Sequence, residues 1–165
     1  MDLRRFLRHA LVPQWWAMRA FPPATLAAVE AAIAASELRH SGELRFVVEA
    51  ALPPAYLLAG RPARERAIEL FSQLRVWDTE ANSGVLIYVQ LLDRKVEIVA
   101  DRGIDARVGQ DFWNAVCARM QSAFHAGRFS DGALAAINEI TAALADHFPP
   151  GGENPNELPD RPLVL

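Results

Sequence analysis

A segment in the middle of the chain, residues 84–92, is apolar on both of its faces. It reads GVLIYVQLL, a pattern typical of a central strand covered by helices on both sides. Only Asp93 and Arg94 separate it from a second strand-like segment at residues 95–100. A link of two residues permits only an antiparallel hairpin. We therefore expect the 84–92 segment to be a central strand with an antiparallel neighbour.

An earlier segment, residues 43–51, alternates in polarity and predicts a third strand. A helical pattern over residues 62–76 separates it from the central strand, and a strand-helix-strand unit of this length is normally a right-handed parallel crossover. The pattern as a whole predicts an α/β layered domain. Three further helices are expected over residues 25–37, 109–126 and 131–148, with Thr25, Asp111 and Ser130 as candidate N-caps.

The chain divides into three parts: a basic and aromatic N-terminal helical extension (1–22), the α/β domain (23–148) and an extended, proline-rich tail (149–165). The extension predicts a short amphipathic helix interrupted at Pro13. It could contact a membrane surface or dock a partner, because arginine and tryptophan suit an interface. We favour the alternative that it packs on the domain, with Trp15 or Trp16 covering the core.

Composition excludes several classes of protein. A net charge of −3 and a pI near 5.8 argue against a nucleic-acid binder. No apolar run is long enough for a transmembrane helix, and the N-terminus lacks the apolar region of a signal peptide. The single cysteine, Cys117, lies on an apolar helical stripe and is expected to be an inert core thiol in a reducing cytoplasm. The expected location is therefore cytoplasmic.

Acidic residues flank the predicted hairpin on both sides. Because the hairpin reverses the chain, residues 101–105 should emerge at the end of the sheet where the central strand begins. Asp93 should then lie at the opposite end as a turn residue. Oxygen ligands without histidine or cysteine favour a hard cation, Ca²⁺ or Mg²⁺, and no motif for an organic cofactor occurs. The candidate metal ligands are Asp78, Glu80, Asn82, Asp101 and Asp105.

The alternative is that these acids only solvate loops and cap helices, with Arg102 and Arg107 pairing some of them. Carboxylates are common in loops, so their spacing alone favours this alternative over a metal site.

Several short motifs then follow in a characteristic order. Residues 82–87 read NSGVLI and are followed by Asp93-Arg94, by Gly103-Ile104-Asp105 and by an aromatic-x-x-G-x-aromatic pattern at residues 124–129. In this order and spacing, the stretch from about residue 44 to residue 148 resembles the TPM domain family. Ser83 stands where the family often has asparagine, and Asp101 where it usually has glycine.

The resemblance implies an α/β/α sandwich with a small mixed sheet and an acidic, calcium-type site; some family members are acid phosphatases. Many members are membrane-tethered, and this chain resembles a short cytoplasmic subtype at the inner face of the membrane. Its implied partner is a membrane-anchored TPM relative or a LemA-like membrane protein.

Three functions follow as hypotheses. The first is a metal-binding interaction module that serves a membrane-associated partner. The second is a metal-free structural partner protein. The third is a metal-assisted phosphomonoesterase, with Asp78 or Asp105 as nucleophile or base and Arg102 stabilising charge. We rank them in this order.

Overall fold

The computed structural model describes residues 3–151 and 156–165. The strands are β1 (Glu43–Glu49), β2 (Gly84–Gln90), β3 (Lys95–Ala100) and β4 (Leu163–Val164). The helical elements are α1 (Leu3–Leu11), the short 3-10 helix η1 (Gln14–Trp16), α2 (Ala17–Ala20), α3 (Pro23–Glu37), α4 (Pro54–Leu58), α5 (Ala63–Gln73), α6 (Arg102–Val108), α7 (Gln110–His125) and α8 (Phe129–His147).

The four strands form one mixed sheet in the order β3-β2-β1-β4. β1 and β2 are parallel, with Glu43 opposite Gly84, so the crossover through α5 is the parallel connection that the pattern predicts. β2 and β3 are antiparallel, with Gln90 opposite Lys95. The predicted α/β class and the mixed sheet, with one parallel crossover and one hairpin, are both confirmed.

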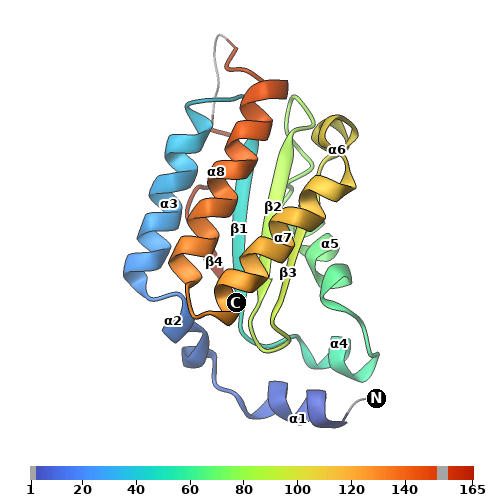
Figure 1. The fold of residues 1–165 in the computed structure, drawn as a ribbon. Coiled ribbons are helices and arrows are strands. Elements are labelled where there is room, and N and C mark those ends of the chain that lie inside the picture. The colour runs from blue at the N-terminus through green and yellow to red at the C-terminus, as the bar shows by residue number, and fades with distance from the viewer. Residues whose placement is uncertain (1–2, 152–155) are drawn as a thin grey trace.

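The sheet lies between two helical layers (Figure 1). Helices α3, α7 and α8 cover one face, and α5 covers the other. Alternate residues of β1 divide between them: Leu44 and Phe46 enter the larger core, and Val47 enters the core beneath α5. This division follows from the two-residue period of a strand. The three-layer sandwich is therefore as the resemblance implied.

Several local expectations were wrong. The hairpin connection has four residues, 91–94, because β2 ends at Gln90, and its Arg94 N–H donates to the carbonyl of Leu91. Residues 102–108 form a helix and not a loop. The expected N-caps also differ, since α3, α7 and α8 begin after Pro22, Gly109 and Arg128, which places Thr25, Asp111 and Ser130 inside their helices.

The tail contributes an unexpected fourth strand. Leu163 pairs with Val47 in the parallel direction, and Leu165 exchanges backbone hydrogen bonds with Val48 and Ala50. The tail therefore extends the sheet on the side away from the hairpin; residues 152–155 lie outside the described part of the chain. Among the described residues, no helix is long and apolar enough to cross a bilayer.

Candidate functional site

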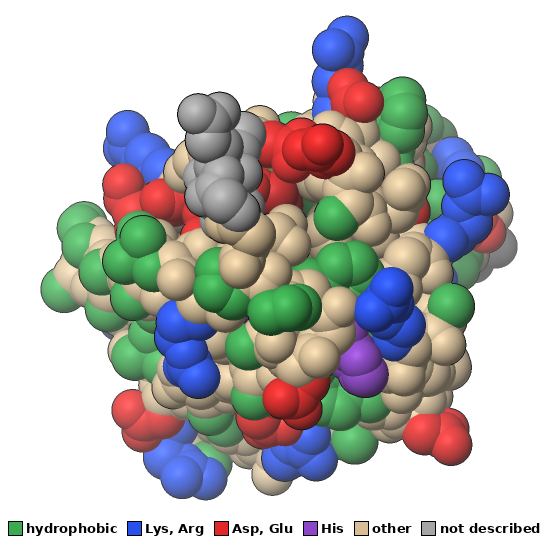
Figure 2. All heavy atoms as spheres, turned by 90° about the horizontal axis from the view of Figure 1, so that it is seen from above, with side chains coloured by type: hydrophobic (Ala, Val, Ile, Leu, Met, Phe, Trp, Pro, Cys, Tyr) green, Lys and Arg blue, Asp and Glu red, His purple; other side chains and the backbone are tan. Residues whose placement is uncertain are grey.

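Two loops meet at the end of the sheet where β1 and β2 begin, which we call the acidic end. Residues 77–83 lead into β2, and Asp101 follows β3 and donates its backbone N–H to the carbonyl of Gly84 at 2.8 Å. Figure 2 looks down on this end and shows exposed acidic side chains beside basic ones. Asp93 lies at the opposite end, in the hairpin connection. The direction of the chain places both groups where the hairpin argument expects them.

Glycine allows the two loops to approach closely. A Cβ atom on Gly103, in the first turn of α6, would lie 2.5 Å from the carbonyl oxygen of Asn82 and 2.9 Å from that of Ala81. A Cβ on Gly84 would lie 1.9 Å from the carbonyl oxygen of Val76. Both separations are far below van der Waals contact, so only glycine fits at either position. The loop before β2 is consequently packed against the start of α6.

The loop before β2 is held by its own hydrogen bonds. The backbone N–H of Asn82 donates to the carbonyl of Thr79, and the N–H of Ser83 donates to the buried Thr79 hydroxyl at 3.1 Å. Asn82 adopts a left-handed conformation with φ of 51°, which asparagine tolerates better than most residues. The side chains of Asp78, Glu80 and Asn82 are exposed, so this backbone presents three oxygen-bearing side chains to solvent.

Asp101 is the buried member of the candidate set. It caps α6, and its Oδ1 accepts a hydrogen bond from the backbone N–H of Arg102 at 2.7 Å. The residue is only 7% exposed, and its Oδ2 is buried without a hydrogen-bond partner. Buried polar atoms almost always have a partner, so an unpaired carboxylate oxygen requires a specific explanation.

Asp105 has a structural contact. Its Oδ1 accepts a hydrogen bond from the indole Nε1 of Trp113 at 3.0 Å, which ties α6 to α7.

The two arginines expected to pair with these acids have other surroundings. Arg107 donates to the carbonyl of His147 and lies over the ring of Phe148, while the Arg102 side chain is exposed. Among the described residues, no three histidine, cysteine or acidic side chains are close enough together to hold a metal.

Two buried acids at this end were missed by sequence reasoning. Glu43 accepts backbone hydrogen bonds from Glu157 and Leu158 of the tail, and Glu37 accepts one from Leu44. Burial raises the pKa of Glu37 to about 8, with a further contribution from the nearby charge of Glu43. Burial also raises the pKa of Glu43. In the sequence, Glu37 only marks the end of a predicted helix and Glu43 the start of a predicted strand, because nothing local shows that the tail covers them.

A buried polar network lies next to these acids. The Ser36 hydroxyl contacts the imidazole Nε2 of His40 at 2.7 Å and the hydroxyl of Thr141 at 2.6 Å. Thr141 in turn donates to the carbonyl of Ile137. Burial lowers the pKa of His40 to about 4, so this imidazole is neutral at physiological pH. The network joins the end of α3 to α8 beneath the acidic end.

Comparison with known proteins agrees with this architecture. The family model described as the TPM domain matches residues 18–143. The NMR structure of the BA42 protein from the psychrophilic bacterium Bizionia argentinensis matches with a TM-score of 0.75 and 30% sequence identity, over 86% of this chain and 93% of that one.

The N-terminal domain of a protein from P. gingivalis, solved by NMR, matches with a TM-score of 0.62 and 17% identity, over 79% of this chain and 82% of that one. This second likeness concerns the fold alone. A search of curated proteins finds no match. Because the family model spans most of the sequence and BA42 matches over nearly the whole of both chains, this chain belongs to the TPM domain family.

Proposed function

We propose that this TPM domain binds a divalent cation, Ca²⁺ or Mg²⁺, at its acidic end and acts as an interaction module for a membrane-associated partner. The observation that carries the proposal is the buried, unpaired Oδ2 of Asp101. A carboxylate oxygen removed from water without a partner is costly. A bound cation would compensate for that cost, because hard cations take carboxylate and carbonyl oxygens as ligands.

The adjoining loop can supply further oxygen ligands. The exposed side chains of Asp78, Glu80 and Asn82 belong to the loop that packs against the first turn of α6. They would have to reorient toward Asp101, since no three acidic side chains already converge in the described residues. A site that needs this rearrangement should be weak, with a dissociation constant of about 10⁻⁴ to 10⁻³ M.

Thermal unfolding of the full chain in increasing Ca²⁺ or Mg²⁺ tests the proposal. A cation at about 100 times its dissociation constant stabilises the folded state by about 2.7 kcal/mol. For a domain of this size, that corresponds to a rise in Tm of about 5–10 °C. Calorimetric titration at constant pH should show the same saturable binding.

The variant that isolates the site is Asp101→Asn, which keeps an oxygen able to cap α6 but removes the charge. Its Tm should no longer respond to the cation. Asp131→Asn is the matched control, because Asp131 is exposed in the first turn of α8, at the other end of the molecule. An equal cation response in Asp101→Asn and the wild-type chain, or no response in either, would refute the proposed site.

The interaction part of the proposal is supported by the family resemblance, which implies a membrane-anchored TPM relative or a LemA-like protein as partner. Purified, detergent-solubilised protein of each kind can be tested for co-elution with this chain, with and without Ca²⁺. Co-elution that requires Ca²⁺ and is lost in Asp101→Asn would show that partner binding depends on the proposed cation site. The absence of co-elution with both partners would refute the interaction part alone.

A further inference from the structure

Helix α1 carries its apolar side chains on the face that points away from the domain. Leu3, Leu7 and Leu11 recur every four residues and are 59%, 47% and 74% exposed. The opposite face carries Arg5 and His9, and His9 is the buried residue of the helix. Surface helices normally bury an apolar stripe against the core, so the polarity of α1 is reversed.

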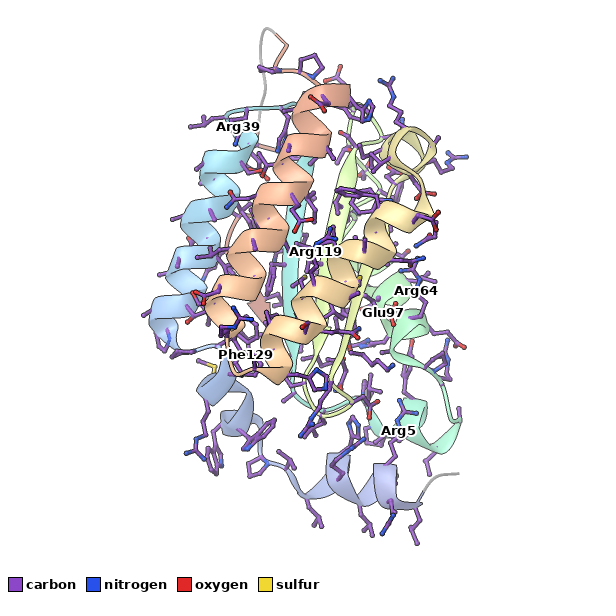
Figure 3. The ribbon with its side chains drawn as sticks, in the orientation of Figure 1. Arg5, Arg39, Arg64, Glu97, Arg119 and Phe129 are labelled. Atoms are coloured by element: carbon purple, nitrogen blue, oxygen red, sulfur yellow. The ribbon has the colours of Figure 1, made fainter. Side chains whose placement is uncertain are left out.

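Polar contacts hold α1 in this orientation. Arg5, Arg8 and His9 all bind the carboxylate of Asp93, at distances between 2.7 and 2.9 Å. Figure 3 shows Arg5 pointing from α1 toward the domain. The main apolar contact is that of Phe6, which packs on a small cluster that includes Leu52. The leucine stripe therefore takes no part in the attachment of α1 and is left facing solvent.

The exposed apolar surface continues beyond α1. Trp15 and Trp16 follow it and are both exposed, at 61% and 40%. Trp16 also lines a pocket of about 190 Å³, together with Phe124, Arg94 and Lys95. Helix α1, η1 and the hairpin connection all lie at the end of the molecule opposite the acidic end (Figure 1). We call this the basic end.

Basic side chains surround the apolar surface, although the whole chain has a net charge of −3. Asp93, an acid in the middle of this end, is already bound by two arginines and a histidine. Exposed cationic residues at the basic end include Arg4, Arg8, Arg19, Arg94, Lys95 and Arg128. The basic end therefore presents arginine and lysine around leucine and tryptophan, whereas the acidic end presents carboxylates beside arginines such as Arg102 and Arg107.

We propose that the basic end docks on an anionic lipid surface, with α1 lying in the plane of the membrane interface. An apolar stripe bordered by arginine, with tryptophan beside it, is the pattern of helices that insert one face at the headgroup boundary. Tryptophan has an apolar body and a polar N–H, which suits that boundary. The surrounding cations add attraction to anionic headgroups. The inference is independent of the cation proposed at the acidic end.

A lipid surface fits these features better than a protein groove does. A groove would cover the leucine stripe but would not require cations on several separate elements around it: α1, α2, the hairpin with the start of β3, and the α7–α8 connection. A membrane contacts all of these elements at once. The rigid attachment of α1 through Asp93 also keeps the stripe outward before any contact is made, so binding requires no refolding.

Vesicle flotation of the full chain tests the proposal. Vesicles of phosphatidylcholine with about 30 mol% phosphatidylglycerol are compared with vesicles of phosphatidylcholine alone. Binding to the anionic vesicles should be at least about tenfold stronger and should weaken when NaCl rises from about 0.1 M to about 1 M, which shortens the screening length. Equal binding to both kinds of vesicle, or none to either, would overturn the proposal.

The double variant L7S/L11S removes much of the stripe without opening a buried site, because both leucines are exposed. Its partition onto anionic vesicles should fall at least tenfold, since each leucine loses the transfer free energy of a large apolar side chain. The double variant L38S/W77S is the matched control, because both residues are exposed but lie outside the basic end. It should bind as the wild-type chain does, and an unchanged Tm verifies that both variants are folded.

Light scattering after size-exclusion chromatography separates this proposal from self-association. If the chain forms a dimer that L7S/L11S converts to a monomer, and the wild-type chain does not bind anionic vesicles, a second copy covers the stripe and the proposal is wrong. A monomeric wild-type chain that binds anionic vesicles through Leu7 and Leu11 supports it. Wild-type binding retained by L7S/L11S would also overturn it.

Discussion

The buried imidazole of His9 joins the N-terminal helix to the hairpin: its Nε2 lies 2.9 Å from the Oδ1 of Asp93, 84 residues away in sequence. Its Nδ1 accepts a hydrogen bond from the backbone N–H of Leu52 at 2.9 Å. With Nδ1 an acceptor, Nε2 carries the hydrogen and donates to Asp93. The residue is only 4% exposed, so the hydrogen bonds of its ring are largely shielded from water.

His9→Ala should therefore destabilise the chain by about 1–3 kcal/mol, because it leaves the N–H of Leu52 buried without an acceptor. Urea unfolding measures this loss, and hydrogen exchange should show faster exchange across α1. His125→Ala is the control, since His125 is exposed and its ring nitrogen hydrogen-bonds the carbonyl of Gln121 on its own helix. If both variants unfold at the same urea concentration, His9 does not hold α1 in place.

The buried Glu37 predicts that stability falls as pH rises. The pKa of Glu37 is raised from 4.5 to about 8 in the folded chain, first by burial and then by the charge of Glu43. Between these two values the folded state holds a proton that the unfolded state has lost. The contribution of protonated Glu37 to the free energy of unfolding is therefore fully present below about pH 4.5 and is lost as pH rises through about 8.

Glu37→Gln should remove this dependence, because the amide cannot ionise and its carbonyl can still accept from Leu44. Relative to the wild-type chain, it should gain about 1–3 kcal/mol between pH 5 and pH 8. Urea unfolding at several pH values measures the slope. Glu139→Gln, at an exposed ion pair with Arg119, should follow the wild-type slope. If the free energy of unfolding of Glu37→Gln varies with pH as that of the wild-type chain does, Glu37 does not hold a proton in the folded state.

Gly103→Ala tests the close approach at the acidic end. The added Cβ would lie 2.5 Å from the carbonyl oxygen of Asn82, and backbone atoms cannot move aside as a flexible side chain can. We expect a loss of about 1–3 kcal/mol, as for other overpacked sites, measured by urea unfolding. In Gly151→Ala the new methyl group meets nothing within 4 Å, so its stability should change by less than about 0.5 kcal/mol. Equal effects would mean that the two loops are not packed together.

Strand β3 lies at an edge of the sheet, and side chains from the neighbouring helices cover it. The guanidinium of Arg64 donates to the carbonyl of Ile98, and Gln121 donates to that of Val96 at 3.4 Å. Figure 3 shows Arg64 beside Glu97, with which it forms an ion pair at 3.8 Å. Exposed strand edges are templates for pairing with another chain, and these side chains reduce that hazard.

Arg64→Ala should therefore increase aggregation under mildly destabilising conditions, because it frees an outward carbonyl on β3. Thioflavin fluorescence and light scattering at elevated temperature measure the effect. The lag before aggregation should be roughly severalfold shorter, because an unprotected edge strand can template pairing with another chain. Arg119→Ala is the control, since Arg119 forms an ion pair with Glu139 on the surface of the helical layer, away from β3. An unchanged lag in Arg64→Ala would show that Arg64 does not protect the edge.

The hairpin illustrates what local sequence could predict. The apolar run 84–92 and the short link after it define a central strand and an antiparallel neighbour, and the direction of the chain then separates Asp93 from Asp101. These inferences succeed because strand period and link length are local properties. Two of the family motifs, residues 82–87 and Gly103, lie in or beside this same hairpin and can be recognised locally for the same reason.

The contacts that shape both ends could not be predicted in this way. Local sequence does not encode that Leu163 in the tail pairs with Val47 of β1. The same tail donates the backbone hydrogen bonds of Glu157 and Leu158 to the buried Glu43. The pattern of α1 predicts an amphipathic helix, but not which of its faces meets the domain.

The layered α/β class, the central hairpin and the end of the sheet at which each acid lies can all be inferred from local patterns. The burial of Asp101 with an unpaired oxygen and the outward leucines of α1 are visible only in the folded chain. Strand and helix periods depend on neighbours a few residues apart. Burial and charge pairing depend instead on residues, such as His9 and Asp93, that meet only after the chain has folded.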